Sequence, residues 1–314
     1  MGTGTRDIFD DPAEPEPASP GSYGQAPLGF RLPAGTHLGR VILQVSRLDT
    51  SLGFYQTVLG FRVAARVASS ALLAAQGDGP PLIELRERAG ARPVPRRGCF
   101  GLYHVAILLP DRASLGRFVS HLEGLRARAG AADHLVSEAF YLQDPDNLGL
   151  EVYADRPRSS WRRIGRELMM ATDPIDVAGL LGTAGSARWS GMPAGTTVGH
   201  VHLHVGDLAQ AAAFYGEGLG FDRTVWHYPG ALFFGADGYH HHLGTNTWAG
   251  EAREAAEDEA GLLEWEVLLP TPHDAFAALD SLAAAGATVE RGPDGGGTRD
   301  PWGTRVRLRG RELS

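Results

Sequence analysis

Apolar and polar residues alternate along four short segments of the chain, and a stretch with helical spacing follows each one. In "HVHLHV" (200–205) histidine alternates with an apolar residue, a pattern that predicts a β-strand. In "ASLGRFVSHLEGL" (113–125) apolar residues recur at three- and four-residue spacing, which predicts an amphipathic helix. Shorter β-rich runs follow, and "SEAFYLQDPDNLGLEVYADRP" (137–157) predicts two strands joined by an Asp-Pro-Asp-Asn turn.

This order recurs as an internal repeat. Residues 38–61 and 198–221 align without gaps at an offset of 160, with ten identities in 24 positions. A third copy begins at residue 102 and a fourth, more diverged, at residue 262. We therefore predict four βαβββ modules, numbered one to four in chain order. Their expected ranges are 37–88, 100–154, 197–247 and 261–310.

A single βαβββ module leaves one face of its sheet uncovered, so the modules should pair around shared cavities. The predicted fold is α+β, with two incomplete barrels. In sequence order the domains would be 37–154 and 197–314, joined by a linker at 155–196 with a short helix near Pro174–Leu181. Residues 1–36 begin with an acidic stretch rich in Pro, Gly and Ser, and we expect them to form a disordered tail.

Composition and charge narrow the functional classes. The 314 residues carry a net charge of −8, which argues against nucleic acid as a partner. No apolar run has transmembrane length, and the N-terminus lacks the features of a signal peptide, so we expect a cytoplasmic protein with no membrane contact. The single cysteine, Cys99, excludes intrachain disulfides and cysteine zinc sites. Any metal would therefore be held by histidine and carboxylate side chains.

Two histidines and one glutamate suggest a metal site in modules two and three. Because strand side chains alternate, His200 shares a face with His202 and His204, whose roles stay open. His104 holds the place that matches His200, 96 residues earlier, and Glu151 lies in the otherwise apolar last strand of module two. Two histidines and one carboxylate are the facial-triad ligands of non-haem Fe(II) oxygenases, although Zn, Mn and Ni use the same ligand types.

Modules one and four do not repeat this set. Arg40 takes the histidine place in module one, Glu264 takes it in module four, and Arg307 takes the place of the metal-site glutamate. We interpret Glu264 as structural. A complete ligand set requires module two to pair with module three across the linker. The sequence leaves open whether the modules pair 1–2 and 3–4 or 1–4 and 2–3.

The repeat signatures "GFYQTVLGF" and "AFYGEGLGF" resemble those of the vicinal oxygen chelate superfamily of glyoxalases, bleomycin-resistance proteins and extradiol dioxygenases. The motifs "GLYHVAILLPDR", "SEAFYLQDPDNLGLEVYADRPRSSW", "VGHVHLHVGDL" and "GYHHHLGTNTWAG" resemble, more narrowly, its bacterial catechol 2,3-dioxygenase-like members. The resemblance runs from about His37 to the C-terminus. It implies an extradiol dioxygenase that takes a small aromatic diol and O₂, uses Fe(II), with Mn(II) as the alternative, and forms a muconic semialdehyde-type product.

The resemblance also implies three catalytic residues. Tyr141 lies ten residues before Glu151, where the family has a tyrosine before its metal-binding glutamate. His134 lies a few residues earlier, where the family has another histidine near the metal. His241 matches the second histidine of a His-His pair that supplies an acid/base. The neighbours of His241, residues 240 and 242, would face the other way in a strand, and their roles stay open.

Two other functions are alternatives. A glyoxalase- or epimerase-type isomerase would use Zn or Ni without O₂, normally with a fourth protein ligand. A metal-free binding or resistance protein would not need His104, His200 and Glu151 to coincide. The oligomeric state is also open, with a homo-oligomer as one alternative.

Overall fold

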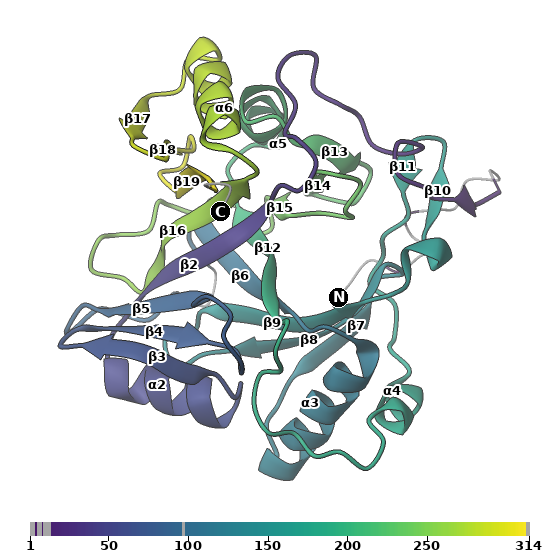
Figure 1. Cartoon of the computed structure of the whole chain (residues 1–314), viewed down its shortest axis with the longest axis vertical. Helices are drawn as coiled ribbons and strands as arrows, with labels where there is room; N and C mark the ends of the chain where they lie inside the picture. The colour runs from purple at the N-terminus through teal and green to yellow at the C-terminus, as the bar shows by residue number, and fades with distance from the viewer. Residues whose placement is uncertain (1–3, 5–7, 9–13, 96–97, 312–314) are drawn as a thin grey trace.

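A computed structural model of the chain describes residues 1–314 except 1–3, 5–7, 9–13, 96–97 and 312–314. It contains two eight-stranded sheets, each built from two modules (Figure 1). Modules two and three build one sheet, which we name the 2–3 sheet. Its strands, in spatial order, are β13 (Asp222–Val225), β14 (Ala231–Gly235), β15 (Leu243–Asn246), β12 (Thr197–His204), β6 (Gly101–Leu108), β9 (Gly149–Asp155), β8 (Ser137–Gln143) and β7 (Gly130–Asp133).

Modules one and four build the second sheet, which we name the 1–4 sheet. Its strands, in spatial order, are β17 (Val289–Gly292), β18 (Gly295–Arg299), β19 (Arg305–Gly310), β16 (Gly261–Leu269), β2 (His37–Val45), β5 (Ile83–Glu87), β4 (Ser70–Ala74) and β3 (Arg62–Val67).

The first strands of the paired modules lie antiparallel at the centre of each sheet. β12 pairs with β6, and β16 pairs with β2. This pairing covers a strand edge that each module alone would expose. The modules therefore pair 1–4 and 2–3. Each sheet takes one module from either side of residues 155–196, so the sheets do not follow the expected division into 37–154 and 197–314.

Each module contributes a helix that packs on the outside of its sheet (Figure 1). The helices are α2 (Leu48–Thr57), α3 (Arg112–Leu125), α6 (Pro272–Ala284) and α5 (Leu208–Ala211), which continues into the π-helical turn η2 (Ala212–Gly218). In α3 the predicted apolar face is buried at Leu115, Phe118 and Leu122, and the Asp111 side chain caps the first turn by accepting from the Ser114 N–H. None of the helices in the described part of the chain combines the length and apolar character that crossing a membrane requires.

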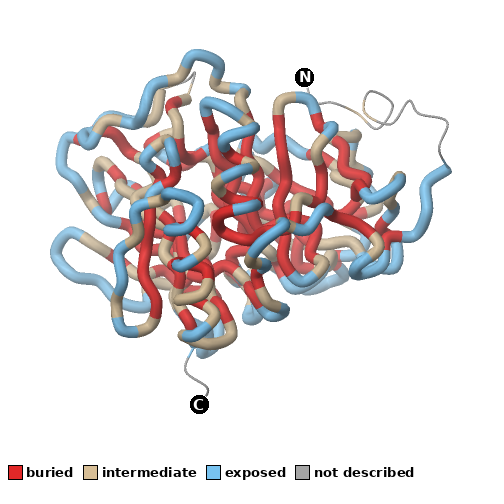
Figure 2. The backbone as a smooth tube through the Cα atoms, turned by 90° about the horizontal axis from the view of Figure 1, so that it is seen from above, coloured by how far each residue is buried: buried red, intermediate tan, exposed pale blue. Residues whose placement is uncertain are grey.

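The two faces of the central strands have different surroundings. Val105 and Ile107 of β6, and Val201 and Leu203 of β12, are fully buried in the core. Figure 2 shows this buried layer running through the middle of the molecule. Because strand side chains alternate, the histidines between these apolar residues point to the opposite face of the sheet. The core therefore holds the strands in place while the other face remains available for a site.

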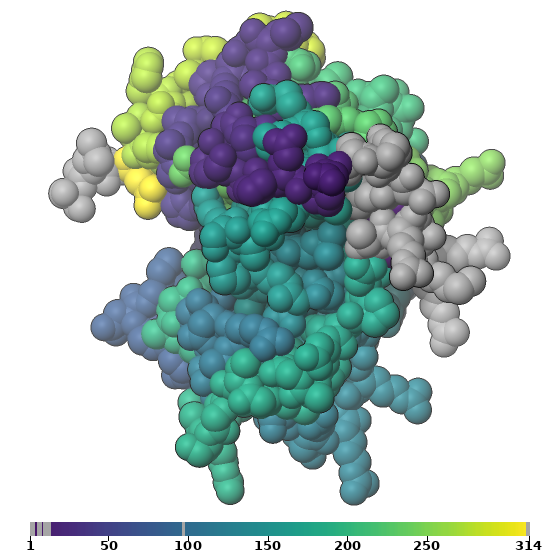
Figure 3. Space-filling view, turned by 90° about the vertical axis from the view of Figure 1, so that its right-hand side faces the viewer, coloured from purple at the N-terminus to yellow at the C-terminus, as the bar shows by residue number. Residues whose placement is uncertain are grey.

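The expectation of a disordered tail over residues 1–36 is wrong for residues 14–36. Strand β1 (Glu16–Pro17) pairs with β10 (Arg162–Ile164), and Tyr23 and Leu32 are buried. The Tyr23 hydroxyl donates to the carbonyl of Gly238 at 2.7 Å. Figure 3 shows this N-terminal segment, in dark purple, lying against later parts of the chain. Most of the preceding residues lie outside the described part of the chain.

Residues 155–196 join modules two and three, as expected, but they form an ordered layer. This segment contains η1 (Arg158–Ser160), β10, β11 (Glu167–Leu168) and α4 (Val177–Thr183), which confirms the short helix predicted there. β11 pairs with β10, and Trp161 and Leu168 are buried. The segment therefore builds a wall beside the 2–3 sheet.

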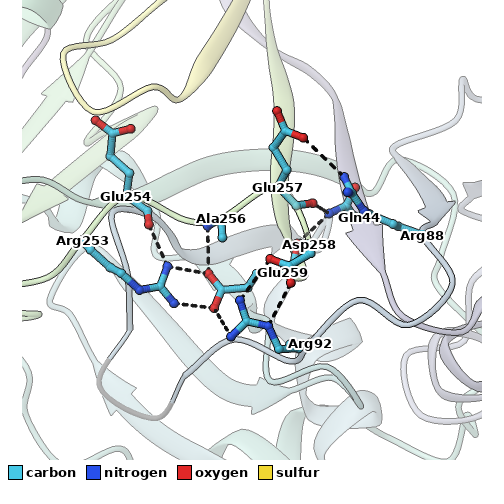
Figure 4. Close-up of polar contacts among 9 residues, drawn as sticks. All are labelled: Gln44, Arg88, Arg92, Arg253, Glu254, Ala256, Glu257, Asp258 and Glu259. Carbon is cyan, nitrogen blue, oxygen red and sulfur yellow. Dashed lines mark hydrogen bonds and ion pairs between the residues drawn. The ribbon is translucent and has the colours of Figure 1, made fainter.

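The connections that lead into β6 and β16 run side by side, bridged between Arg92 and Glu259 (Figure 4). The Glu259 side chain is only 1% exposed. Its carboxylate accepts from Arg253 at 2.5 and 2.7 Å and lies 3.3 Å from the Arg92 guanidinium. The hydrogen bonds from Arg253 lower the pKa of Glu259 to about 2. Ion pairs between the buried Glu259 carboxylate and two surface arginines thus link the two connections.

Candidate metal centre

Three side chains of the 2–3 sheet converge on one point. The Nε2 atoms of His104, on β6, and His200, on β12, lie 3.3 Å apart. The Oε2 atom of Glu151, on β9, lies 2.9 Å from the His104 nitrogen and 3.2 Å from the His200 nitrogen. All three side chains are buried. They form the one cluster of three convergent metal-ligand atoms found among the described residues.

The register of three adjacent strands explains this convergence. Ala106 of β6 pairs with His200 of β12 on one side and with Glu151 of β9 on the other. Directly paired residues point to the same face of a sheet, and His104, two residues along, shares that face. The small Ala106 side chain lies between the two larger ones and leaves room for them to meet above it.

The geometry and charge of these donors fit a divalent metal ion. Bonds of about 2.1 Å at right angles place neighbouring ligands of an octahedral metal about 3.0 Å apart, close to the distances found here. Burial alone would raise the pKa of Glu151, but His200 and His104 outweigh it and hold that pKa well below its ordinary value. Burial lowers the pKa of His200 to about 4. An ionised carboxylate and a neutral imidazole are the forms that bind metals.

The matching places in the 1–4 sheet hold ion pairs instead. The Arg40 guanidinium lies 3.4 Å from the Glu84 carboxylate, and the Glu264 carboxylate accepts from Arg305 at 2.7 Å. The guanidinium of Arg307 replaces the metal-site carboxylate. A guanidinium cannot act as a metal ligand, because its nitrogens stay protonated. Within the repeat, the ligand set is therefore present in one sheet and replaced by ion pairs in the other.

A cavity of about 450 Å³ opens above the three donors. All six predicted site residues line it: His104, His134, Tyr141, Glu151, His200 and His241. Tyr103 and Trp248 lie at the cavity and are 39% and 45% exposed, so they mark its solvent side. Met170 and Thr172, from the segment between modules two and three, also contribute to the wall. The structure thus brings the predicted residues together at one place, where their chemical roles stay predictions.

Tyr141 and His134 form a hydrogen-bonded pair in this cavity. Tyr141, on β8, lies directly opposite Glu151 on β9, so the ten-residue spacing corresponds to a cross-strand pair. His134 Nδ1 donates to the carbonyl of Ala171 at 2.6 Å, which leaves its Nε2 to accept from the Tyr141 hydroxyl at 2.5 Å. Burial, followed by the charge of Glu151, raises the pKa of Tyr141 well above its ordinary value. The phenol therefore stays protonated, and its oxygen can still accept a hydrogen bond.

His241 lies beside the metal donors. Its ring centroid is 4.1 Å from that of His200, and its Nδ1 is 2.7 Å from Nδ1 of His240. Burial holds the pKa of His241 well below its ordinary value, which favours a neutral ring. The three consecutive histidines are not part of a strand, because β15 begins only at Leu243. His241 lines the cavity, whereas its two histidine neighbours do not.

The other histidines differ in whether their ring nitrogens have hydrogen-bond partners. Nδ1 of His242 accepts from the backbone N–H of Ala236 at 3.2 Å, and His204 Nδ1 is 2.7 Å from Oδ1 of Asn246. These two rings have structural partners. His202 lines the cavity, and its buried Nε2 has no hydrogen-bond partner among the described residues.

Sequence reasoning missed Asp155, whose Oδ1 lies 2.9 Å from Nε2 of His240. Asp155 is four residues after Glu151 on the same strand, so the alternation rule places both on one face. That signal was available in the sequence. Its partner, His240, could not be identified from the sequence, because this residue lies in a bend rather than in a paired strand.

Comparisons with known proteins show the relatives of this chain. Residues 37–152 and 197–308 match the family model described as the Glyoxalase/Bleomycin resistance protein/Dioxygenase superfamily. The chain is 44% identical over 271 residues to Catechol-2,3-dioxygenase from Bacillus subtilis (strain 168), an alignment that covers 85% of this chain and 94% of that protein.

Solved structures share the fold at low sequence identity. A proposed dioxygenase from Bacillus subtilis subsp. subtilis str. 168 matches with a TM-score of 0.57 and 13% identity, covering 87% of this chain and 84% of that one. Glyoxalase I from Zea mays matches with a TM-score of 0.53 and 16% identity, covering 88% and 92%. These likenesses confirm the predicted α+β fold of paired βαβββ modules. With the family model matching most of its length, the chain belongs to the glyoxalase/bleomycin resistance protein/dioxygenase superfamily, the vicinal oxygen chelate superfamily that its repeats resemble.

Proposed function

We propose that the chain is an extradiol dioxygenase of the catechol 2,3-dioxygenase type, which opens the ring of a catechol-type aromatic with O₂. The observation that carries the proposal is one cavity lined by the two histidines and glutamate of a facial triad and by Tyr141, His134 and His241. The 44% identical catechol-2,3-dioxygenase, aligned over 94% of its length, supports the same activity.

His104, His200 and Glu151 would hold the metal, with Fe(II) proposed and Mn(II) as the alternative. Two neutral imidazoles and one carboxylate leave a bound divalent ion with a net positive charge. When bound, such an ion supplies Lewis acidity that lowers the pKa of a coordinated hydroxyl, together with open coordination positions for the reactants.

Tyr141 would orient the diol. Its proton is directed to His134 Nε2, because the other nitrogen of that ring donates to a backbone carbonyl. The phenol oxygen is therefore an acceptor for a hydroxyl of the substrate in the cavity. One hydrogen bond at a fixed angle restricts rotation of the substrate's aromatic ring. Orientation of this kind lowers the entropic part of the activation barrier.

His241 would act as the acid/base. Its Nδ1 is engaged by His240, so Nε2 is the ring nitrogen left to face a ligand. A neutral imidazole can take the proton of a substrate hydroxyl at Nε2 and return it as the ring opens. Both atoms of O₂ enter the product, a muconic semialdehyde-type compound, when the bond next to the two oxygens breaks.

The number of convergent donors favours this reaction over a metal-dependent isomerase. The isomerase alternative normally needs a fourth protein ligand, and the cluster in the described part of the chain offers three. A metal-free binding protein would have no use for two imidazoles and a carboxylate buried together, because burying ionisable groups costs stability.

Oxygen uptake tests the proposal. The protein would be loaded anaerobically with Fe(II), supplied with simple catechols in air-saturated buffer, and compared with the His104→Ala variant. We expect O₂ consumption with a yellow ring-opened product from the native protein and none from the variant.

The iron content tells the possible failures apart. Native protein that binds iron but consumes no O₂ with any catechol would contradict the catechol substrate class. Native protein that neither retains iron nor consumes O₂ would favour the isomerase or the metal-free alternative.

A further inference from the structure

His241 is one end of a row of three hydrogen-bonded side chains. Its Nδ1 lies 2.7 Å from Nδ1 of His240, whose Nε2 lies 2.9 Å from Oδ1 of Asp155. His241 lines the cavity, and Asp155, 28% exposed, lies toward the molecular surface. Neither His240 nor Asp155 lines the cavity, so any influence on the substrate must act through His241.

The chemistry of these groups sets the direction of each hydrogen bond. An ionised carboxylate can only accept, so His240 donates its Nε2 proton to Asp155. The other nitrogen of a neutral His240 ring, Nδ1, is then an acceptor. It must receive the Nδ1 proton of His241, because a contact of 2.7 Å between two ring nitrogens needs one proton. His241 is left with an unprotonated Nε2 for the cavity.

We propose that Asp155 and His240 are positioning residues that hold His241 in the tautomer whose Nε2 accepts the substrate proton. The inference rests on the proposed function for its chemical purpose. The tautomer itself can be measured without any turnover. If the order of donors were reversed, Nε2 of His241 would carry the proton and could not act as a base.

The surroundings of His240 keep this ring from turning. It is fully buried and packs against Tyr239 and Trp161, with ring centroids 4.1 and 5.4 Å away. The Thr224 hydroxyl donates to the His240 carbonyl at 2.6 Å. The Tyr239 hydroxyl also donates to Asp155, at 3.2 Å. A rigid ring between a carboxylate and a second imidazole is well suited to setting a tautomer.

Asp155→Asn tests the inference with little change in shape. The amide can present its N–H₂ to His240, which removes the fixed acceptor and allows the reverse order of protons. Asp237→Asn is the matched control, since the exposed Asp237 carboxylate accepts from the Gly35 N–H at 3.2 Å and lies outside the row.

The first measurement is the ¹⁵N NMR spectrum of the histidine rings in the Zn(II)-loaded full-length protein, with the His241 signals assigned by comparison with His241→Gln. We expect the proton on Nδ1 of His241 in the native protein and in Asp237→Asn. We expect a mixed or reversed tautomer in Asp155→Asn. A native protein with the proton on Nε2, or a tautomer that Asp155→Asn leaves unchanged, would overturn the inference.

The second measurement is steady-state kinetics of the Fe(II)-loaded protein with catechol. We expect Asp155→Asn to lower kcat at least about tenfold, as loss of an oriented base does, with KM and iron content close to native. A variant with native kcat would contradict the positioning role. A native protein without dioxygenase activity would overturn the proposed function, and the NMR result would still decide the tautomer.

Discussion

His104 and His200 stand on neighbouring antiparallel strands from different modules, and their Nε2 atoms lie 3.3 Å apart. They are separated by 96 residues of sequence, including all of the segment between modules two and three. Neither module alone offers more than two of the three donors. The candidate metal centre therefore exists only because β6 pairs with β12, and its integrity should depend on that pairing.

Removing one donor should abolish metal retention. We expect His200→Ala to keep less than about one-tenth of the native iron after gel filtration, because loss of one of three ligands greatly weakens binding at an open site. Arg40→Ala is the matched control, since Arg40 holds the place of His200 in module one but contacts Glu84 instead. Iron would be measured by elemental analysis of the folded protein. Native iron content in His200→Ala would contradict the proposed ligand set.

Tyr141→Phe should impair catalysis while leaving the fold intact. The variant loses only the hydroxyl, which contacts His134 at 2.5 Å and faces the cavity. We expect kcat/KM for catechol to fall about tenfold, equivalent to about 1.4 kcal/mol, the size of one hydrogen bond. Initial rates of O₂ uptake measure this effect. Native kcat/KM at native iron content would exclude Tyr141 from contact with the substrate.

Gly149→Ala should destabilise the strand that carries Glu151. A Cβ at Gly149 would lie 1.9 Å from the backbone oxygen of Tyr103, so the strands β6 and β9 would have to separate. We expect the free energy of unfolding to fall by about 3 kcal/mol or more, with loss of bound metal.

The control for this variant is Gly182→Ala in α4, where an added Cβ meets no atom within 4 Å. Alanine favours helices over glycine by about 1 kcal/mol, so this change should be neutral or stabilising. Urea unfolding curves followed by circular dichroism compare the two variants. If both variants are equally stable, strands β6 and β9 can move apart at Gly149 without a measurable loss of stability.

Glu259 should contribute stability that depends on pH. Its pKa is lowered to about 2 in the folded protein by Arg253, so the folded state favours the ionised form. This contribution is complete above pH 4.5, the ordinary pKa, and is lost as the pH falls toward about 2. At neutral pH we expect Glu259→Gln to lower the free energy of unfolding by about 2 kcal/mol.

Denaturant unfolding of the metal-free protein at pH 7 and at pH 3 measures this effect. The gap between Glu259→Gln and the native protein should narrow at the lower pH. Glu254→Gln is the control, because Arg253 contacts the backbone oxygen of Glu254 rather than its carboxylate (Figure 4). A gap that stays constant with pH would show that the carboxylate charge is not responsible.

Local patterns were enough to predict the general order of strands and helix in the four modules and the candidate ligands. The alternation in "HVHLHV" follows from the two-residue period of a strand, and the spacing of Leu115, Phe118 and Leu122 follows from the helical period. Glu151 was recognisable because a carboxylate in an apolar strand needs a partner. These inferences depend only on neighbours along the chain. The resemblance added Tyr141, His134 and His241.

Contacts between segments that are far apart in the sequence depend on how the modules pack together. Four βαβββ modules, and a ligand set divided between modules two and three, could be predicted from patterns along the chain. The packing of Tyr23 and Leu32, the pairing of modules 1–4 and 2–3, and the contact between His240 and Asp155 appeared only in the folded chain. Strand edges and apolar surfaces select their partners by fit and burial, and both are properties of two surfaces together. The sequence pattern of one segment describes only one of the two surfaces in such a contact.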